Sequence, residues 1–581
     1  MSPSPPNARP PHHPVTPSLR HSVIFAALTL LALAAIYLWL LRPQLGRPLV
    51  YDDVNFASAA RAVAETGLPY GNQGHMSDRW DFSRREQWAL WHPPLYVELL
   101  GLQFKLFGVS ETSGRLLGAA FGLLTAALVY LTGRALGPGG SLAREATGLL
   151  GAAFYLLSPL AIQSALILDI DGTVLTFLLA LLAYVLVRFP PERHPRSLPA
   201  LAALFALALW AKLTTPLGLL ACLVVVRVLA GRPRQALREL LIVGLGGGAI
   251  FLVTWGLACL VFRMPFDMPF AVTWIELLDA SENSRSWLRS PTTVAQTVAP
   301  SLLWTGPYLA PLFAAAGLAS LRGYLTTRKV QPIDLLLGFG VVIFFIYLIK
   351  LAGGFPKYHV AMLPFWAVSV GALVVETVGR LLLVEGVLLL GGLALFGWYF
   401  ATRLPEAWVY GYNPDLGNQL AVFPGLLAAA LLAALYLATG RGLGRGLALV
   451  LTVMALAWGP AVERSLGRVG YSTTYYFGTH GQREAAEVVD ALTAPDEFYA
   501  ASKDVAWYAR NQRYLDQDTL EYFVRQAGNR FDGRLLGYDV RVLALWVRPD
   551  FLQALYREAL SPAYDLVAER GDYAIWVRRA R

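Results

Sequence analysis

The chain has 581 residues, of which 56% are hydrophobic and only 15% are charged, with a formal net charge of +9. Ordinary soluble domains carry about 25% charged residues, so a purely soluble protein is excluded. The apolar residues form long blocks without strand-like alternation, which indicates membrane-spanning α-helices. The basic residues lie in short hinges between these blocks, and this pattern does not favour nucleic-acid binding.

Residues 1–21 are rich in Pro, His and Ser and predict a disordered cytoplasmic tail. The first apolar block, 22–41, is too long for a signal-peptide core and lacks a small-residue cleavage site, so we expect it to remain as a helix. About thirteen spans are predicted within a membrane domain at 22–462. The further blocks lie near 115–136, 145–167, 171–188, 198–213, 215–231, 239–262, 301–321, 333–351, 358–378, 381–401, 419–438 and 446–462.

The hinges predict the orientation of these spans. If the N-terminus is cytoplasmic, the basic hinges fall on the cytoplasmic side along the whole chain. They contain Arg134, Arg144, Arg188, Arg193, Arg196, Arg227, Arg232, Arg234, Arg238, Arg322, Arg328, Lys329, Arg441 and Arg445. We therefore expect a multi-pass protein of the plasma (inner) membrane, with external segments at 42–113, 263–300 and 463–581.

The segment 463–581 differs in composition from the membrane region. Its charges are interspersed, and short β-like runs occur at Glu497–Ala501, Arg541–Val547 and Tyr573–Val577. An amphipathic helix is predicted at Arg483–Leu492. The expected fold is thus an all-α polytopic membrane domain of about 13 helices with external amphipathic helices, followed by a small extracytoplasmic α/β domain.

Two adjacent carboxylates, Asp52 and Asp53, open the first external loop. Apolar residues follow at helical spacing through Phe56–Val63 and predict an amphipathic helix along the membrane surface that ends at Gly67. The carboxylates could simply complement the helix dipole. Adjacent helix positions differ by ~100°, so only one of the two can point into a given cavity.

The same loop carries a Trp-His-Pro-Pro-Leu-Tyr run at 91–96, which includes His92. A Phe-Gly-x-x-Glu run at 107–111 and then Arg115 lead into the second span. Two prolines predict a break before a second surface helix. By itself, His92 could be an interfacial histidine.

Taken together, these motifs resemble the dolichyl-phosphate-mannose protein mannosyltransferase-like family of the C-type glycosyltransferase superfamily, which includes the lipid A aminoarabinose transferases. The resemblance continues with Asp169, Asp171, Lys212 and a Phe-Pro-Lys-Tyr run at 355–358. It covers roughly residues 22–400, and the C-terminal segment resembles no family that we can name.

The resemblance implies a hexosyl- or pentosyltransferase that moves a sugar from a polyprenyl-phosphate donor to an extracytoplasmic hydroxyl or amine of a glycan, lipid or protein. Asp52 occupies the family's catalytic position. Asp53, which stands where glutamate is usual, and Asp171 are further catalytic candidates. Phosphate leaves as an anion without needing a proton, so one carboxylate suffices to take the acceptor's proton. A single displacement would invert the anomeric centre.

The leaving phosphate needs cations near the outer membrane surface. The candidates are Lys357, His92, Arg263 and Arg115. Lys357 and Arg263 could instead be interfacial anchors. In the aminoarabinose transferases a lysine commonly occupies the position of His92, so the chain departs from that subgroup there.

The substrate cavity is expected to include Asp169, Lys212 and Tyr358. Intramembrane carboxylates are usually functional, and Asp171 fits the spacing of the family better than Asp169. Lys212 could pair with a carboxylate or reach towards the interface. Tyr347 is expected in an interfacial aromatic belt.

No metal and no cofactor are expected, because no metal-ligand spacing or dinucleotide-binding glycine loop is present and the family generally needs no metal. Cys222 and Cys259 lie in apolar blocks and are expected to be buried. One alternative function is a transporter or flippase for lipid-linked sugars, although transporters tend to show repeated halves. Another is a catalytically inactive relative whose outer domain binds envelope polymers.

Overall fold

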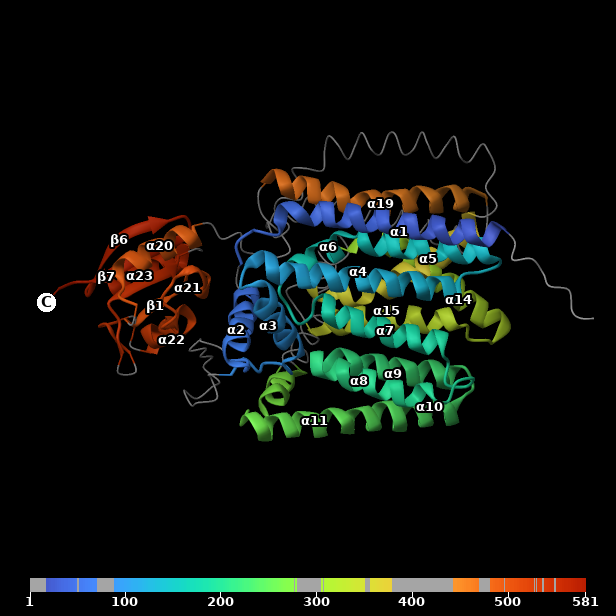
Figure 1. Cartoon of the computed structure of the whole chain (residues 1–581), viewed down its shortest axis with the longest axis horizontal. Coiled ribbons are helices and arrows are strands. Elements are labelled where there is room, and N and C mark those ends of the chain that lie inside the picture. The colour runs from blue at the N-terminus through green and yellow to red at the C-terminus, as the bar shows by residue number, and fades with distance from the viewer. Residues whose placement is uncertain are drawn as a thin grey trace, which may run out of the picture.

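The structure is a computed structural model. It describes residues 17–49, 52–70, 88–275, 277–278, 305–306, 308–350, 356–378, 442–469, 481–495, 497–526, 528, 530–535, 538–547 and 550–580. Most helices of the membrane region lie side by side along the long axis of the molecule, and the C-terminal domain lies beyond one end of them (Figure 1). The helices of this bundle are α1 (Pro17–Leu41), α4 (Glu111–Leu136), α5 (Ser141–Leu156), α6 (Pro159–Leu166), α7 (Thr173–Arg188), α8 (Ser197–Ala211), α9 (Thr214–Leu229), α10 (Pro233–Glu239), the π-helix η3 (Leu240–Gly246), α11 (Gly247–Phe262), α14 (Leu309–Thr327), α15 (Pro332–Lys350), η4 (Pro356–Met362), α16 (Leu363–Val378) and α19 (Gly442–Val469).

Among the described residues, four helical stretches are long and apolar enough to cross a membrane: Ile24–Gln44, Glu111–Leu136, Pro233–Phe262 and Lys357–Thr377. The pair α5 and α6, bent by 55°, makes a fifth if it counts as one span. A multi-pass membrane protein is thus confirmed, whereas the number thirteen stays a prediction. The predicted spans 381–401 and 419–438 lie outside the described residues.

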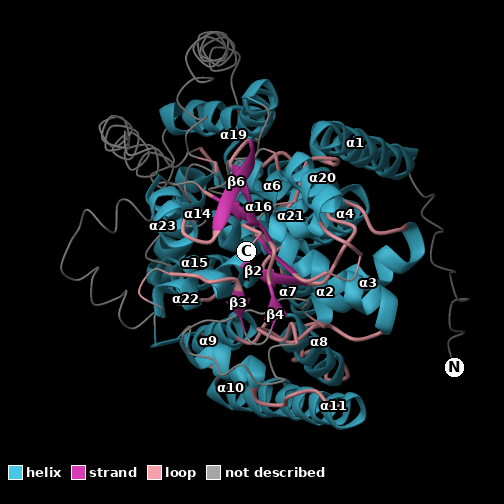
Figure 2. Cartoon of the chain, turned by 90° about the vertical axis from the view of Figure 1, so that its left-hand side faces the viewer, coloured by secondary structure: helices cyan, strands magenta, loops and turns pink. Residues whose placement is uncertain are grey.

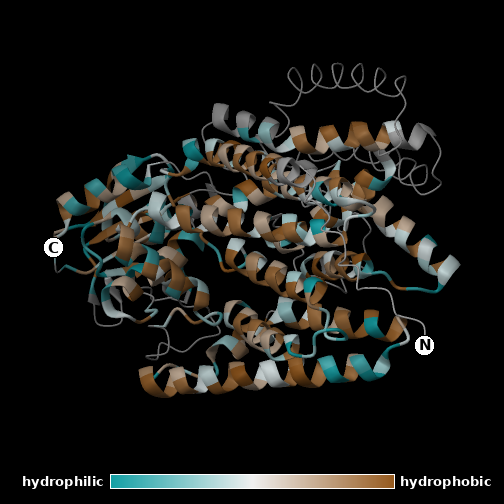
Figure 3. Cartoon of the chain, turned by 45° about the vertical axis from the view of Figure 1, so that its right-hand side comes forward, coloured by the Kyte–Doolittle hydropathy of each residue, from teal (hydrophilic) through white to brown (hydrophobic). Residues whose placement is uncertain are grey.

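The outer surface of the bundle is apolar, as a lipid-facing surface requires (Figure 3). Large apolar side chains point outward on α11, where Leu260 is 80% exposed, and on α1, where Phe25 is 63% exposed. In water such a surface would favour association. In a bilayer it is the ordinary solvent-facing side of the protein.

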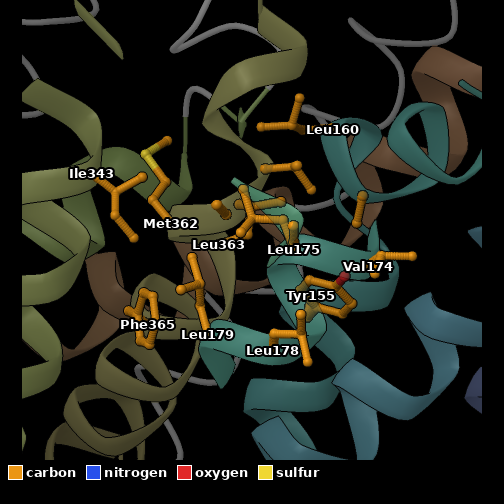
Figure 4. Packing of buried hydrophobic residues seen from close by; sticks show 14 of the residues in the cluster. Tyr155, Leu160, Val174, Leu175, Leu178, Leu179, Ile343, Met362, Leu363 and Phe365 are labelled. Atoms are coloured by element: carbon orange, nitrogen blue, oxygen red, sulfur yellow. The ribbon is translucent and has the colours of Figure 1, made fainter. Parts of the chain in front are cut away.

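The interior of the bundle is a continuous apolar core in which α5, α6 and α7 meet α15, η4 and α16 (Figure 4). Leu175 and Leu179, one turn apart on α7, point towards Leu363 and Phe365. This packing holds η4, and with it Lys357, against α6 and α7.

Two breaks in the helices place polar residues inside the bundle. Residues 167–172 between α6 and α7 are not helical and carry two aspartates. Lys212 follows the last residue of α8 in an extended conformation, and α9 begins at Thr214. The apolar blocks at 198–213 and 215–231 therefore form two helices separated by a polar break.

The first loop forms α2 (Asp52–Thr66) and α3 (Leu95–Phe107), which pack against each other. Gly67 adopts φ 80 where α2 ends, as its position predicts, since glycine tolerates this conformation. Helix α2 forms where the sequence predicts it, but the exposed polar face expected of an amphipathic helix is wrong for its first half, because its residues from Asp53 to Ala60 are all buried. Helix α3 covers one side of it, and the C-terminal domain covers another.

The C-terminal domain is a small α/β unit. Its sheet has the order β2-β1-β5-β7-β6. Strand β1 pairs in parallel with β2 and with β5, whereas β7 pairs antiparallel with both β5 and β6. The predicted strands correspond to β1 (Tyr499–Ala501), β5 (Val542–Trp546) and β7 (Tyr573–Arg578). The other elements are α20 (Gln482–Leu492), α21 (Lys503–Tyr508), β2 (Tyr514–Asp516), α22 (Gln517–Gln526), a short hairpin of β3 (Arg534–Leu535) and β4 (Tyr538–Asp539), α23 (Asp550–Leu560) and β6 (Tyr564–Arg570).

Helices cover both faces of this sheet, because alternate residues of a strand point to opposite sides. Leu543 and Leu545 of β5 pack in one cluster with Tyr556 of α23. Val542 and Ala544 pack in the other, with residues of α20 and α21. The domain therefore has its own core. It begins later than predicted, since α19 continues through position 463 to Val469.

Candidate active site

Lys357 joins two carboxylates from distant parts of the chain. Its Nζ donates to Asp52 Oδ2 at 2.7 Å and to Asp169 Oδ2 at 2.5 Å. Asp52 begins α2, Asp169 lies between α6 and α7, and Lys357 belongs to η4. The lysine is only 4% exposed. Three segments thus meet at one buried ammonium group.

Asp52 is the most accessible member of this cluster, with a side chain 29% exposed, whereas that of Asp169 is 5% exposed. Burial would raise the pKa of the Asp52 carboxyl, but the Lys357 ammonium group outweighs burial and holds that pKa below its ordinary value. Asp52 is therefore ionised at neutral pH. It combines negative charge with access, as a base towards a substrate requires.

Asp53 points elsewhere, as its adjacent helix position predicts. Its Oδ1 accepts from the backbone N–H of Leu168 at 2.9 Å, and its Oδ2 lies 3.9 Å from Nη2 of Arg115. Burial raises the pKa of Asp53 to about 7, against the opposing effect of Arg115. The residue ties α2 to the connection between α6 and α7.

Arg115 uses its guanidinium group on the backbone. It donates to the carbonyl oxygens of Leu166 at 2.8 Å and Leu45 at 2.9 Å, and also to those of Gln44, Arg47 and Pro48. The side chain is 4% exposed. These contacts give Arg115 a role in holding the start of the first loop, and they occupy the donors that a phosphate would need.

A second buried ion pair lies in the same connection. Lys212 donates to both carboxylate oxygens of Asp171. Tyr347 also donates to Asp171 Oδ1, at 2.9 Å, and its hydroxyl lies 2.6 Å from that of Thr215. The interfacial position expected for Tyr347 is wrong, because its side chain is fully buried. Of the two alternatives predicted for Lys212, the structure shows the one in which it pairs with a carboxylate rather than extending to the interface.

Tyr358 connects the two lysine clusters. The centre of its ring lies 4.9 Å from Nζ of Lys357 and 5.6 Å from Nζ of Lys212, and it stacks on the ring of Tyr347 at 5.7 Å. Of the two aspartates, Asp169 shares Lys357 with Asp52, while Asp171 binds Lys212. Asp169 is therefore the aspartate that lies beside Asp52, whereas the sequence spacing favoured Asp171.

The remaining candidate cations lie at different places. His92 is half-buried in the turn before α3, and its neighbour Trp91 packs edge-on against Phe56 of α2 at 6.2 Å. Arg263 is exposed at the end of α11, in the left-handed conformation with φ 56. No cluster that could hold a metal ion occurs within the described part of the chain.

One residue that the sequence did not single out adjoins this site. Lys503 begins α21 of the C-terminal domain, is 7% exposed, and its charge acts on Asp52. Nothing in its local sequence marks it, because its place depends on how two distant domains pack.

Residues 91–256 match the family model described as dolichyl-phosphate-mannose-protein mannosyltransferase. The predicted family resemblance is confirmed. This mannosyltransferase-like segment includes the turn at His92, Arg115, both aspartates between α6 and α7, and Lys212, whereas Asp52 and Lys357 lie outside it. No curated protein sequence matches the chain.

The whole chain is similar in fold to ArnT from Cupriavidus metallidurans, solved in the apo state and bound to undecaprenyl phosphate. The bound form aligns with a TM-score of 0.57 at 15% identity, covering 96% of this chain and 98% of ArnT. The apo form aligns with a TM-score of 0.56 at 16% identity over the same shares. The oligosaccharyltransferase AglB from Archaeoglobus fulgidus aligns at 0.48 and 14% identity, covering 96% of this chain and 74% of AglB.

Proposed function

We propose that the protein is a membrane glycosyltransferase that moves a sugar from a polyprenyl-phosphate donor to an extracytoplasmic acceptor, with inversion at the anomeric carbon. The observation that carries this proposal is the Lys357 bridge between Asp52 and Asp169. It combines an accessible base with a cation suited to phosphate. ArnT, whose fold the chain shares, was solved with undecaprenyl phosphate bound.

Lys357 changes partner when the donor binds. Without donor, its ammonium group neutralises Asp52 and makes that carboxylate a weak base. A donor phosphate next to Lys357 competes for the same N–H groups. Once Lys357 turns to the phosphate, Asp52 loses its counter-charge while staying largely buried. Its affinity for a proton then rises when an acceptor is in place.

The transfer step then balances in atoms and charge. The acceptor oxygen, or nitrogen, attacks the anomeric carbon from the face opposite the phosphate, and its proton passes to Asp52. The bond between that carbon and the phosphate oxygen breaks, and the polyprenyl phosphate leaves with one more negative charge. Lys357 stabilises this charge as it develops. Asp52 becomes neutral, so the total charge is conserved.

Asp169 holds Lys357 throughout the reaction. It accepts from the ammonium group, and its Oδ1 also accepts from the backbone N–H of Asp171 at 3.0 Å. A lysine held on one side by a fixed carboxylate can exchange its other partner without moving far. Such preorganisation lowers the cost of reaching the reactive geometry.

The proposed topology places this chemistry outside the cytoplasm. The N-terminus is cytoplasmic and the protein resides in the plasma (inner) membrane, so the first loop and the C-terminal domain share the outer side. The basic hinges support this orientation. Protease digestion of intact spheroplasts should cut the C-terminal domain, and complete protection would contradict the orientation.

The function is tested with purified protein in liposomes that contain a panel of radiolabelled hexosyl- and pentosyl-undecaprenyl phosphates, with an envelope extract as acceptor mixture. Release of undecaprenyl phosphate, detected by mass spectrometry, reports transfer whatever the acceptor. We expect release by the wild-type protein, a loss of about 10²–10⁴-fold in Asp52→Asn, and no loss in Asp565→Asn, which removes a surface carboxylate.

Movement of intact donor across the liposome membrane without release would instead support the transporter or flippase alternative. Normal turnover by Asp52→Asn would contradict the proposed role of that carboxylate. If no donor releases undecaprenyl phosphate, this would contradict transferase activity and favour the alternative of a catalytically inactive relative.

A further inference from the structure

The Phe-Gly-x-x-Glu run at 107–111 forms the turn between α3 and α4. Gly108 adopts φ 86, a conformation that favours glycine, and Ser110 caps α4 by accepting from the backbone N–H of Ser113 at 3.1 Å. Glu111 is thereby fixed as the first residue of α4. Its side chain is 15% exposed, and no step of the proposed transfer uses it.

Two residues of the C-terminal domain bind Glu111. Arg483 of α20 forms an ion pair with it, and the hydroxyl of Tyr508, at the end of α21, donates to Glu111 Oε1 at 2.9 Å. The guanidinium group of Arg483 also lies over the ring of Tyr508, 5.1 Å from its centre. Hydrogen bonds to a carboxylate are stronger than those between neutral groups. Glu111 thus anchors two helices of the domain to the start of α4.

The same hydroxyl of Tyr508 also accepts from the backbone N–H of Leu49 at 3.0 Å. Leu49 is fully buried and precedes the proposed base Asp52 by three positions. Arg483 contacts the same stretch of chain by donating to the carbonyl oxygen of Gly46 at 3.3 Å. The hydroxyl therefore accepts from the backbone before Asp52 while it donates to the carboxylate at the start of α4. Hydrogen bonds connected in this way strengthen one another.

Trp507, the neighbour of Tyr508 on α21, holds the chain on the other side of Asp52. Its carbonyl oxygen accepts from Nη2 of Arg61 at 3.2 Å, and the guanidinium group lies 3.8 Å from the centre of its ring. Trp507 is 6% exposed, and its ring centre lies 6.3 Å from that of Phe104 on α3. Figures 1 and 2 both place α21 beside α2. Buried aromatic side chains of this kind are strong anchors at an interface.

These contacts lie on both sides of Asp52 in the sequence. Leu49 lies three positions before it, and Arg61 lies nine positions after it on the same helix. Both bind neighbouring residues of α21. A segment held at two points against one helix can shift or rotate little, and a displacement of about 1 Å at a reacting group can cost about 10²-fold in rate. Docking of the domain therefore restricts where the Asp52 carboxylate can lie.

We propose that Tyr508 is a positioning residue for the transfer reaction, which sets the place of Asp52 while Glu111 fixes Tyr508. This inference rests on the proposed transferase function. The C-terminal domain acts on the chemical step, because it holds the base against the acceptor. Donor binding changes little, because Lys357 and the carboxylates that bind it belong to the membrane region. A protein with an undocked domain would bind polyprenyl phosphate but transfer the sugar slowly.

The test compares Tyr508→Phe with wild type in the liposome assay over a range of donor concentrations. This variant keeps the ring and removes only the hydroxyl. We expect kcat to fall about tenfold, while the KM for the donor and the Kd for undecaprenyl phosphate stay within about threefold of wild type. The matched control is Tyr564→Phe, which removes a hydroxyl bonded at 2.6 Å to the carbonyl oxygen of Val540 within the C-terminal domain and should keep wild-type kcat.

A double-mutant cycle distinguishes positioning from a general loss of structure. If the hydroxyl acts through Asp52, adding Tyr508→Phe to Asp52→Asn should not lower the residual single-turnover rate further. Glu111→Gln should lower kcat in the same direction as Tyr508→Phe, and the two changes together should cost little more than the larger one. Thermal unfolding checks that each variant is folded, and Glu111→Gln takes the same test if Tyr508→Phe does not fold.

Wild-type kcat in Tyr508→Phe would overturn the inference while leaving the proposed function intact. An equal further loss on adding Tyr508→Phe to Asp52→Asn would do the same, because the hydroxyl would then act independently of that carboxylate. If the wild-type protein releases no undecaprenyl phosphate from any donor, the proposed function fails and the inference fails with it.

Discussion

Lys357 and Lys212 are both buried, and each binds an aspartate of the short connection between α6 and α7. The two lysine clusters differ in the other groups that bind these side chains and in how exposed the carboxylates are. Asp171, beside Lys212, also accepts from Tyr347, and both charged side chains are at most 3% exposed. Lys357 divides its ammonium group between two carboxylates, one of which is 29% exposed. We therefore propose that the Lys212 cluster is structural, whereas Lys357 can exchange one of its partners.

The largest effect expected from this comparison is on turnover after Lys357→Ala. Removing a cation that stabilises a leaving oxyanion typically costs 10²–10³-fold, and here Asp52 would also lose its resting partner. We expect a loss of about 10³-fold in undecaprenyl phosphate release. Lys329→Ala, at an exposed lysine, should retain wild-type turnover. Near-normal turnover by Lys357→Ala would remove the distinction between the clusters.

Lys212→Met should chiefly affect stability. It would leave Asp171 buried without its cation, which costs about 3–5 kcal/mol when a buried pair is broken. Denaturant unfolding of the detergent-solubilised protein measures this loss. Adding Asp171→Asn to the same chain should recover much of it, because the uncompensated charge is then removed. A Lys212→Met protein as stable as wild type would show that the pair is not structural.

The two aspartates of the connection sharpen the comparison further. Asp169→Asn loosens the hold on Lys357 and should lower kcat by about 10- to 100-fold, whereas Asp171→Asn should lower it by less than about tenfold. Initial rates at saturating donor separate the two variants. The opposite order would favour the assignment of Asp171 as catalytic that the sequence spacing suggested.

The smallest effect concerns Asp53, which belongs to neither lysine cluster. Burial raises its pKa from the ordinary acidic range to about 7. The folded protein therefore holds a proton that the unfolded chain releases near pH 4. This contribution to stability is complete below about pH 4 and is lost as the pH rises through 7. Asp53→Asn keeps the acceptor for Leu168 and should reduce the slope.

The slope of unfolding free energy against pH, measured between pH 4 and 7 on both proteins, tests this expectation. The difference should approach about 1.4 kcal/mol per pH unit at most. Glu98, whose pKa burial also raises to about 7, contributes a slope of the same sign in both proteins. Identical slopes would show that Asp53 is ionised in the folded state.

Hydropathy predicted most of the helices correctly, because long apolar blocks dominate their own neighbourhood. The strands around Tyr499, Val542 and Tyr573 were also predicted correctly, because each forms from a β-like run in its own local sequence. The motifs also indicated Asp52, Asp169 and Lys357 together, through family resemblance. The family resemblance thus indicated which residues form the site, and the structure shows which of them contact one another.

The sequence could not predict which lysine binds which aspartate, because the aspartates stand in an irregular connection where no periodicity fixes side-chain direction. Tyr347 looked like an interfacial tyrosine, since its hydrogen-bond partner Asp171 is 176 positions away. The burial of α2 and the position of Lys503 depend on domain docking. Arg61 and Trp507, which make one docking contact, are 446 positions apart.

The central claim is that Lys357 leaves Asp52 for the donor phosphate. A high-resolution structure of the purified protein with undecaprenyl phosphate bound tests it most directly. We predict the phosphate within hydrogen-bonding distance of Lys357 Nζ, the contact between Lys357 and Asp169 retained, and the 2.7 Å contact with Asp52 opened. A phosphate bound away from Lys357, with the Asp52 pair intact, would contradict the account.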